Sequence, residues 1–397
     1  MTQDVYRISK SIREKFKVFP LKPEDLSRLT NVGLEHFSYL KEVSSINFSI
    51  FFRVNMELLE FITPANFSHE LVERIIVARD KDYQNLDICV RGLDYPKFQN
   101  LVDSVRSKKI TTLLEKDPLL DRKTMQIFGN LSGASQMIVR GGISANVAQQ
   151  AKKSASQLID NLMESHVAIG TLSRMVLADA TLYDHSASVA MLAGIIGKNL
   201  MGLSKDDAER CARGGLYHDV GKTCVPNNIL NKPGKFTPEE FEIMKTHTTL
   251  GYEELLRAIE NGAPIEEEVA IVTLEHHERF CGGGYPVGKS GRREERVEGI
   301  SLYARVVTIA DVYSALLMKR VYKEAYDQNQ TLDIMRSNAD RDYDPVIWKK
   351  FEKSVDRSNV HYKELESRPV DTSKGRIFFM DEDGFRSSNS IKKNKSS

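Results

Sequence analysis

Hydrophobic and polar positions divide the chain into a mixed N-terminal part and a longer part of helical character. The segments NFSIFFRV (47–54) and NLDICVRG (85–92) are rich in residues that favour strands. Between them, HELVERIIVARD (69–80) repeats its apolar residues at helical spacing. The pattern predicts a small α+β domain over residues 1–105. Its role is left open between a sensory or regulatory domain and a structural or dimerising one.

From residue 106 onward the apolar spacing becomes helical. Apolar positions between residues 147 and 167 follow an i, i+3, i+4 stripe, which predicts a helical linker over residues 106–169. Residues 170–355 are expected to be almost wholly helical. The expected elements there are a helix capped by Ser204, a helix opened by a Thr237–Glu240 capping box and running through residue 256, and helices over 266–278 and 300–317.

The end of the chain has a different character. Residues 356–397 lose the periodic spacing and finish in SSNSIKKNKSS. Polar, charged sequence without an apolar stripe cannot bury enough surface to fold. We therefore expect a disordered tail there.

Composition narrows the classes of function. Of the 397 residues, 41% are hydrophobic, as in an ordinary globular protein. The net charge of +1 gives no overall attraction to nucleic acid, so no DNA partner is expected. No apolar run approaches the roughly 18 residues that a membrane span needs. The N-terminus does not resemble a secretory signal, and the four cysteines show no paired spacing. A cytoplasmic protein with reduced thiols is expected.

Histidines gather in one stretch of the chain. Five of the nine lie between residues 185 and 277, and two aspartates accompany them; the set is His185, His218, Asp219, His247, His276, His277 and Asp311. A single histidine is more often a core or surface residue than a ligand. Seven nitrogen and oxygen donors without a thiolate exceed what one four-coordinate zinc requires. They suit two six-coordinate ions, iron or manganese, bridged by a carboxylate.

Helix geometry constrains how the adjacent histidines can act together. Neighbouring residues on a helix point about 100° apart, so His276 and His277 can both bind metal only if metals lie on either side of the helix axis or if the helix ends there. The following ERFCGGGYP, with three glycines and a proline, predicts such an end. The same reasoning applies to His218 and Asp219, which Gly221 soon follows.

Four segments together resemble a known family, the HD-GYP domain. They are HDVGK (218–222), PNNILNKPGKFTPEEFEIMKTH (226–247), HHERFCGGGYP (276–286) and ARVVTIADVYSALLMKRVYK (304–323). The resemblance implies a mainly α protein, in which an all-helical HD-type catalytic domain follows the small α+β domain. It also implies a bacterial signalling enzyme, a phosphodiesterase that hydrolyses cyclic di-GMP to linear pGpG. Further hydrolysis to GMP is left open.

The resemblance also assigns metal ligands by position. One metal would be held by His185, His218, Asp219 and Asp311, and the other by Asp219, His247, His276 and His277. Two metals about 3.5–4 Å apart lower the pKa of a bridging water, which becomes a hydroxide nucleophile, and clamp the phosphodiester. Some members bind a third metal through a glutamate one helical turn before the first histidine. Thr181 stands there in this chain, so two metals are expected.

Four further residues are candidates for substrate contacts. By the resemblance, Lys222 would act beside Asp219 at the scissile phosphate, and Arg320 with Lys323 would grip substrate phosphates. Tyr285 of GGGYP would stack on a guanine or support the pocket wall. From the residues alone, a basic pair such as Arg320 and Lys323 more often lies on a solvated face, and Lys222 could also be a solvated surface lysine. Tyr285 could equally pack a loop onto the core.

The chain departs from the family pattern at two positions. Cys281 and Ser314 stand where the family has aspartates, which weakens the expected support for the metal histidines. These departures favour one alternative, a catalytically weak receptor for cyclic dinucleotides. A second alternative is a phosphodiesterase for cyclic GMP-AMP, which the sequence does not distinguish from one for cyclic di-GMP. An HD-superfamily hydrolase of mononucleotides is disfavoured by the second histidine pair and GGGYP. A homodimer through the linker helices and signalling partner proteins are left open.

Overall fold

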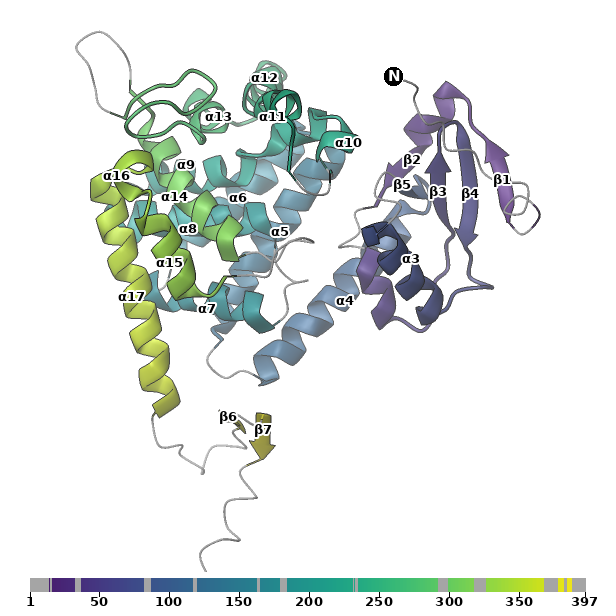
Figure 1. The fold of residues 1–397 in the computed structure, drawn as a ribbon, viewed down its shortest axis with the longest axis horizontal. Helices are drawn as coiled ribbons and strands as arrows, with labels where there is room; N and C mark the ends of the chain where they lie inside the picture. Colours follow the sequence, from purple (N-terminus) through teal and green to yellow (C-terminus); the bar gives the residue numbers. More distant parts are fainter. Residues whose placement is uncertain are drawn as a thin grey trace, which may run out of the picture.

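The computed structural model describes most of the chain. The described residues are 14, 16–32, 37–81, 87–116, 120–162, 165–178, 184–230, 232, 235–291, 299–317, 326–367, 378–381 and 384–387. Figure 1 shows a small sheet domain beside a larger bundle of helices, joined by one long helix. The structure is therefore mainly α with an N-terminal α+β part, as predicted.

The N-terminal domain is built on a five-stranded antiparallel sheet in the order β1-β4-β3-β5-β2. Its elements are β1 (Lys17–Pro20), η1 (Pro23–Arg28), β2 (Leu29–Asn31), η2 (Ser38–Glu42), β3 (Ile50–Val54), β4 (Glu57–Ile62), α3 (His69–Lys81) and β5 (Asp87–Arg91). The predicted strands and the helix between them are confirmed. Asn55, in the left-handed region at φ 55°, makes the turn between β3 and β4, a conformation that asparagine tolerates better than most residues. The core includes Phe37, Leu40, Phe52 and Ile88.

The remaining elements form the helical bundle. They are α4 (Tyr95–Lys116), α5 (Arg122–Gly141), α6 (Ala145–Asp160), α7 (Ser165–Ala178), α8 (His185–Ile195), η4 (Ile196–Leu200), α9 (Lys205–Tyr217), η5 (Val220–Cys224), α10 (Asn227–Leu230), α11 (Pro238–Lys245), α12 (His247–Glu260), α13 (Glu267–Glu275), α14 (Leu302–Leu317), α15 (Gln328–Arg336), α16 (Ala339–Asp342) and α17 (Pro345–Ser367). Among them, no helix in the described ranges is both long and apolar enough to cross a bilayer.

The structure differs from the predicted boundaries around the linker. Helix α4 runs across the expected boundary at residue 105, with Val102 in the core of the sheet domain and Leu113 packed on the core of the bundle. Phe128 of α5 and Leu158 of α6 are fully buried in the same core as the following helices. The segment expected to connect two domains is thus an integral part of the helical bundle. Its apolar stripe predicted burial without showing which neighbour would provide it.

The C-terminal boundary also differs from the prediction. Helix α17 continues past residue 355 to Ser367, and Ser358 is fully buried, accepting a hydrogen bond from the Gln328 side chain at 3.1 Å. Between Pro345 and Pro369 the sequence contains neither glycine nor proline, so no helix-breaking residue ends the helix sooner. Farther on, β6 (Phe378–Asp381) and β7 (Gly384–Ser387) form a two-stranded antiparallel pair. The rest of the expected tail lies outside the described residues.

One predicted helix is divided in two. The Thr237–Glu240 capping box is present, but the helix that it opens ends at Lys245, and α12 begins at His247. The Thr246 hydroxyl donates to the Ile243 carbonyl at 2.6 Å, and hydroxyls that bond to the preceding turn compete with regular helix formation. The break places His247 at the start of a helix.

Candidate metal centre

Five separate elements bring the predicted ligands together, and most of these ligands stand at helix ends. His185 is the first residue of α8, and His247 is the first of α12. His218 and His276 directly follow the last residues of α9 and α13. Asp219 and His277 come next along the chain, and Asp311 lies within α14. The predicted helix ends at both adjacent pairs are confirmed.

Local sequence explains how these helix ends meet. A Cβ on Gly221, in η5, would collide with the His247 carbonyl oxygen, so only glycine lets η5 approach the start of α12. A Cβ on Gly215, in α9, would lie 2.9 Å from the Ala190 backbone of α8. These close approaches carry His218 and Asp219 to the ends of α8 and α12. Ahead of His185, the Asp184 side chain caps α8 by accepting from the Ala187 amide at 2.9 Å.

One half of the cluster lies around Asp311. Nε2 of His185 is 3.0 Å from Asp311 Oδ1 and 3.9 Å from Asp219 Oδ2. Nε2 of His218 is 3.2 Å from Asp219 Oδ2 and 3.7 Å from Asp311 Oδ1. Two imidazole nitrogens and two carboxylates therefore face one another. We call His185, His218, Asp219 and Asp311 the carboxylate-rich half.

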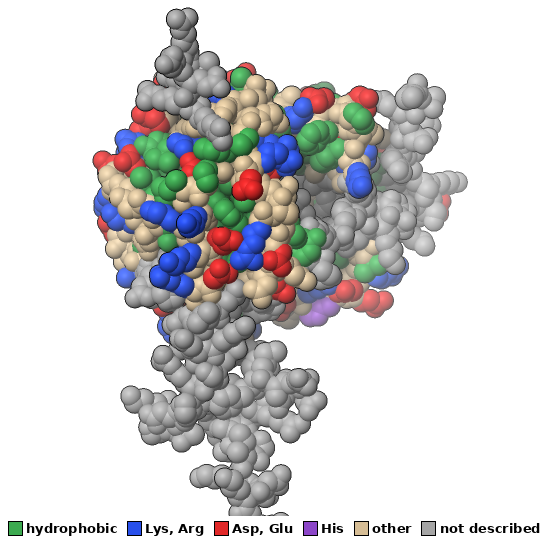
Figure 2. Space-filling view, turned by 60° about the vertical axis from the view of Figure 1, so that its left-hand side comes forward, with side chains coloured by type: hydrophobic (Ala, Val, Ile, Leu, Met, Phe, Trp, Pro, Cys, Tyr) green, Lys and Arg blue, Asp and Glu red, His purple; other side chains and the backbone are tan. Residues whose placement is uncertain are grey.

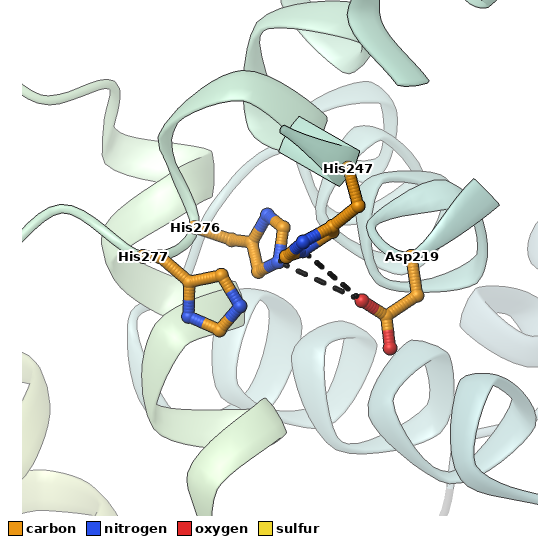
Figure 3. Close-up of side chains that lie close together, drawn as sticks. All are labelled: Asp219, His247, His276 and His277. Carbon is orange, nitrogen blue, oxygen red and sulfur yellow. Dashed lines mark hydrogen bonds and ion pairs between the residues drawn. The ribbon is translucent and has the colours of Figure 1, made fainter. Parts of the chain in front are cut away.

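The second half lies on the other oxygen of Asp219. Asp219 Oδ1 is 3.5 Å from His247 Nε2 and 3.9 Å from His276 Nε2 (Figure 3). The two histidine Nε2 atoms are 3.4 Å apart, and His277 contributes a ligand atom within 4.8 Å of the others. We call Asp219, His247, His276 and His277 the imidazole-rich half. Asp219 belongs to both halves, one carboxylate oxygen to each.

The donor atoms are oriented for metal ligation. Nδ1 of each of three histidines donates to the carbonyl three residues earlier: His218 to Gly215 at 2.7 Å, His247 to Met244 at 2.7 Å and His276 to Thr273 at 2.9 Å. These bonds fix the tautomer and leave the Nε2 lone pair facing the cluster. His218 Nε2 and Asp219 Oδ1 are buried without a hydrogen-bond partner in the described part of the chain. Buried polar atoms of this kind need a partner, and divalent cations fit the donor set.

Electrostatics sets the protonation state of the two carboxylates. Burial alone would raise the pKa of Asp219, but His218, Lys222 and His185 outweigh it and hold that pKa well below its ordinary value. For Asp311, too, burial is outweighed, here by the hydrogen bond from His185 and the neighbouring histidines, which lower its pKa. The carboxylates are therefore anionic.

Burial also sets the state of the imidazole-rich half. It lowers the pKa of His247, lowers that of His276 further, and brings the pKa of His277 to about 4. These three rings are neutral near pH 7 and keep a lone pair for a metal. In the carboxylate-rich half, burial works against the charged form of His218, but Asp219 and Asp311 outweigh it and raise its pKa.

The structure describes two of the four residues predicted to contact substrate, and both lie beside the metal cluster. Lys222 donates a hydrogen bond to Asp219 Oδ2, with 36% of its side chain exposed. Tyr285 packs on the cluster, its ring 4.7 Å from that of His277, and its contact with substrate stays a prediction. Arg320 and Lys323 lie outside the described residues, as does Thr181.

The two departures from the family pattern have different consequences. Ser314 is buried, and its Oγ lies 2.9 Å from Nδ1 of His185, so a hydroxyl supports this histidine where the family has a carboxylate. Cys281 is exposed, and its amide and thiol bond to the carbonyls of Arg341 and Asp340. The GGGYP segment is therefore still attached to the neighbouring turn. All four cysteines are free thiols.

Two buried glutamates beside the histidine pair were not predicted. Glu278 is 2% exposed, and its Oε1 accepts from the amides of Val287 and Gly288. Glu275 is 3% exposed and accepts from the Ser301 amide at 2.7 Å. Both hold the chain that follows GGGYP. Their partners lie nine or more residues away, a separation at which no local sequence signal exists.

Charges are mixed on the surface of the bundle. Figure 2 shows Lys and Arg side chains interspersed with acidic and hydrophobic ones on the face drawn. This mixture agrees with the overall net charge of +1. Anion recognition on this face would therefore depend on local groups rather than on a broad field.

Comparison with known proteins identifies the segment that carries the cluster. Residues 171–347 match the family model described as HD domain, and HHERFCGGGYP lies within this match. This segment is an HD-GYP domain. Among solved structures, an HDG"Y"P protein from Bdellovibrio bacteriovorus superposes with a TM-score of 0.51 at 16% identity, covering 83% of this chain and 99% of that chain. At that identity the likeness shows the fold alone.

Curated relatives match the HD-GYP domain at higher identity. The cyclic di-GMP phosphodiesterase response regulator RpfG of Xanthomonas campestris is 39% identical over 181 residues, which cover 44% of this chain and 45% of the relative. A cyclic di-GMP phosphodiesterase of Thermotoga maritima is 33% identical, covering 50% and 51%. The 3'3'-cGAMP-specific phosphodiesterase 2 of Vibrio cholerae is 29% identical, covering 57% and 39%. The chain spans about half the length of the first two.

Proposed function

We propose that this protein is a metal-dependent phosphodiesterase that hydrolyses cyclic di-GMP to linear pGpG. The observation that carries the proposal is the convergence of five imidazoles and two carboxylates, with Nε2 atoms facing one shared aspartate. The relatives named as cyclic di-GMP phosphodiesterases match the same HD-GYP segment. Further hydrolysis of pGpG to GMP is left open.

The proposed cofactors are two divalent ions, iron or manganese. Nitrogen and carboxylate donors without a thiolate suit these metals. The carboxylate-rich half would hold one ion and the imidazole-rich half the other, with Asp219 shared between them. Bound there, two ions would activate water for attack and stabilise the charge that develops on the phosphodiester.

The chain's own residues would position the substrate. Lys222 places a partly exposed ammonium beside Asp219, where it can neutralise negative charge on the phosphate undergoing attack. Tyr285 would support His277 and one wall of the site. Arg320 and Lys323 remain predicted phosphate contacts. Dimerisation and partner proteins also remain predictions.

A second substrate has support from the relatives. Three of them are named 3'3'-cGAMP-specific phosphodiesterases. Cyclic GMP-AMP offers the same phosphodiester to the same cluster, so the metal ligands cannot discriminate between the two dinucleotides. The proposal of a catalytically weak receptor rests on Cys281 alone, because Ser314 still supports His185.

Turnover on defined substrates tests the proposed function. The full chain would be prepared without oxygen, loaded with Fe(II) or Mn(II), and incubated with cyclic di-GMP or cyclic GMP-AMP. We expect pGpG from cyclic di-GMP, detected by chromatography, and none from the Asp219→Ala variant. Saturable binding without hydrolysis by the metal-loaded protein would support the receptor and contradict the enzyme.

A further inference from the structure

An aromatic side chain at the edge of the metal centre takes no part in the core. None of the eight residues of α11 is buried, and Phe241 is 45% exposed. A lone exposed phenylalanine would need no explanation. Phe241, however, meets Tyr285 edge to face, with ring centroids 6.2 Å apart and an angle of 82° between the planes.

Phe241 is the outer member of a series of rings. The Tyr285 ring lies 4.7 Å from His277, inclined by 30°, and the His277 ring lies 5.2 Å from His247. The series leads from the proposed metal ligands to a half-exposed phenylalanine. An aromatic surface therefore begins at the proposed site of hydrolysis and extends toward solvent.

A cation accompanies the two outer rings. Lys245 Nζ lies 5.4 Å from the centre of the Phe241 ring and 5.8 Å from that of Tyr285. It also pairs with Glu242 at 2.6 Å, but the Glu242 side chain is 68% exposed. Such a surface pair contributes little to stability. The ammonium can therefore turn to a ligand at low cost.

We propose that Phe241 and Lys245, together with Tyr285, receive one purine base of the cyclic dinucleotide. Phe241 and Tyr285 supply the aromatic surface for the base, and Lys245 donates to the O6 and N7 acceptors of guanine. This inference rests on the proposed function, because it names how that same site recognises its substrate. Stacking on an aromatic ring accepts any base, whereas a lysine donor favours guanine over adenine, which carries an amino group at the position of O6.

Binding of a hydrolysis-resistant probe tests the stacking residue. The probe is the bis-phosphorothioate analogue of cyclic di-GMP, titrated calorimetrically into the metal-loaded full chain. Phe241→Ala should weaken binding by about tenfold, the effect expected for loss of one stacked ring. Phe241→Trp keeps an aromatic face and should bind like the original chain. The matched control is Ile243→Ala, on the same helix and 40% exposed, which should leave the affinity unchanged.

Base preference tests the lysine. The same titrations with the bis-phosphorothioate analogue of cyclic di-AMP give the ratio of the two affinities. Lys245→Met keeps most of the length of the side chain and removes the charge, so the preference for the guanine analogue should fall by about tenfold. Lys245→Arg keeps a donor for O6 and N7 and should retain the preference.

Kinetics separate base recognition from a purely structural role. With cyclic di-GMP, Phe241→Ala should raise KM and leave kcat close to that of the original chain. A lower kcat at unchanged KM would overturn the inference, as would equal probe affinities for Phe241→Ala and Ile243→Ala. If the original chain binds the probe through Phe241 but hydrolyses no dinucleotide, the base site stands and the proposed enzymatic function fails.

Discussion

The two halves of the metal centre hold their ligands in different electrostatic surroundings. The carboxylate-rich half contains Asp219 and Asp311 within 3.9 Å of two histidine Nε2 atoms, and the pKa of His218 is raised there. The imidazole-rich half has three histidines whose ligand atoms lie within 4.8 Å of one another and of an oxygen of Asp219, and all three pKa values are lowered.

This difference shows that burial alone does not decide the charge of a histidine. His218 and His276 are equally buried, at 0% exposure, yet their pKa values move in opposite directions. His218 has two carboxylates beside it, whereas His276 has other imidazoles as its main neighbours. Local charge outweighs the common cost of desolvation in the first case and not in the second. Each of the following experiments acts on this contrast.

Removal of the shared ligand should have the largest effect. Asp219 offers one oxygen to each half, so Asp219→Ala and the isosteric Asp219→Asn should each lose both ions. Hydrolysis of cyclic di-GMP should fall by about a thousandfold or more, because transition-state charge is no longer stabilised. Elemental analysis gives the metal content, and circular dichroism checks that the fold persists. A folded Asp219→Asn variant with both ions would show that the halves are independent of Asp219.

Variants that remove a ligand from only one half of the centre should each lose one of the two ions. His185→Ala removes a ligand of the carboxylate-rich half, and His277→Ala removes one from the imidazole-rich half. Each variant should lose one ion and retain the other, with hydrolysis strongly reduced in both. Elemental analysis and turnover on the same preparations provide the measurement. Loss of both ions in either variant would mean that the two positions fill only together.

Acidification should destabilise the metal-free protein. The folded pKa of His277 is about 4, below the ordinary value near 6.5, so between these values the unfolded chain binds more protons. Stability is therefore full above pH 6.5 and declines as the pH falls toward 4, by about 2 kcal/mol at pH 5 from this residue alone. The lowered pKa values of His247 and His276 also reduce the stability of the fold on acidification, whereas the raised pKa of His218 has the opposite effect.

Denaturant unfolding at pH 7 and pH 5 measures this effect on chelator-treated protein. His277→Gln cannot titrate and provides the control, since its loss of stability between the two pH values should be smaller. A His277→Gln variant that loses as much stability as the original chain would contradict the assignment of the effect to His277.

Loss of the hydroxyl that supports His185 should have the smallest effect. Ser314→Ala removes the partner of Nδ1 and should weaken metal binding in the carboxylate-rich half by about tenfold. The imidazole-rich half should be unaffected. Ser358→Ala, which also removes a buried hydroxyl but one bonded to Gln328, is the matched control. Competition with a metal chelator measures both affinities, and equal values for the two variants would exclude a role for Ser314.

Local signals in the sequence predicted much of the site. Ser204 caps α9 and the Thr237 capping box opens α11, as their spacing indicated. The glycines after His276 and His277 predicted the helix end that lets both rings face the cluster. These features depend on neighbouring residues, so the sequence contains the information directly. The assignment of each ligand to one ion came from the family resemblance and stays a prediction.

Other features depend on contacts that the sequence does not display. The apolar stripe of α6 predicted burial but not its packing on the HD-GYP helices. The sequence does not show that Ser314 lies opposite His185 and bonds to it. The contacts of Phe241 with Tyr285 and Lys245 also appear only in the fold. Each of these relations joins residues from different elements, which periodicity and spacing cannot connect.

The most direct test of the account is the metal content of the full chain purified without oxygen, measured together with its turnover of cyclic di-GMP. We predict two divalent ions per chain and hydrolysis to pGpG that a chelator abolishes and Fe(II) or Mn(II) restores. A chain that hydrolyses cyclic di-GMP equally well after complete removal of metal would contradict the assignment of these seven side chains as the catalytic metal centre.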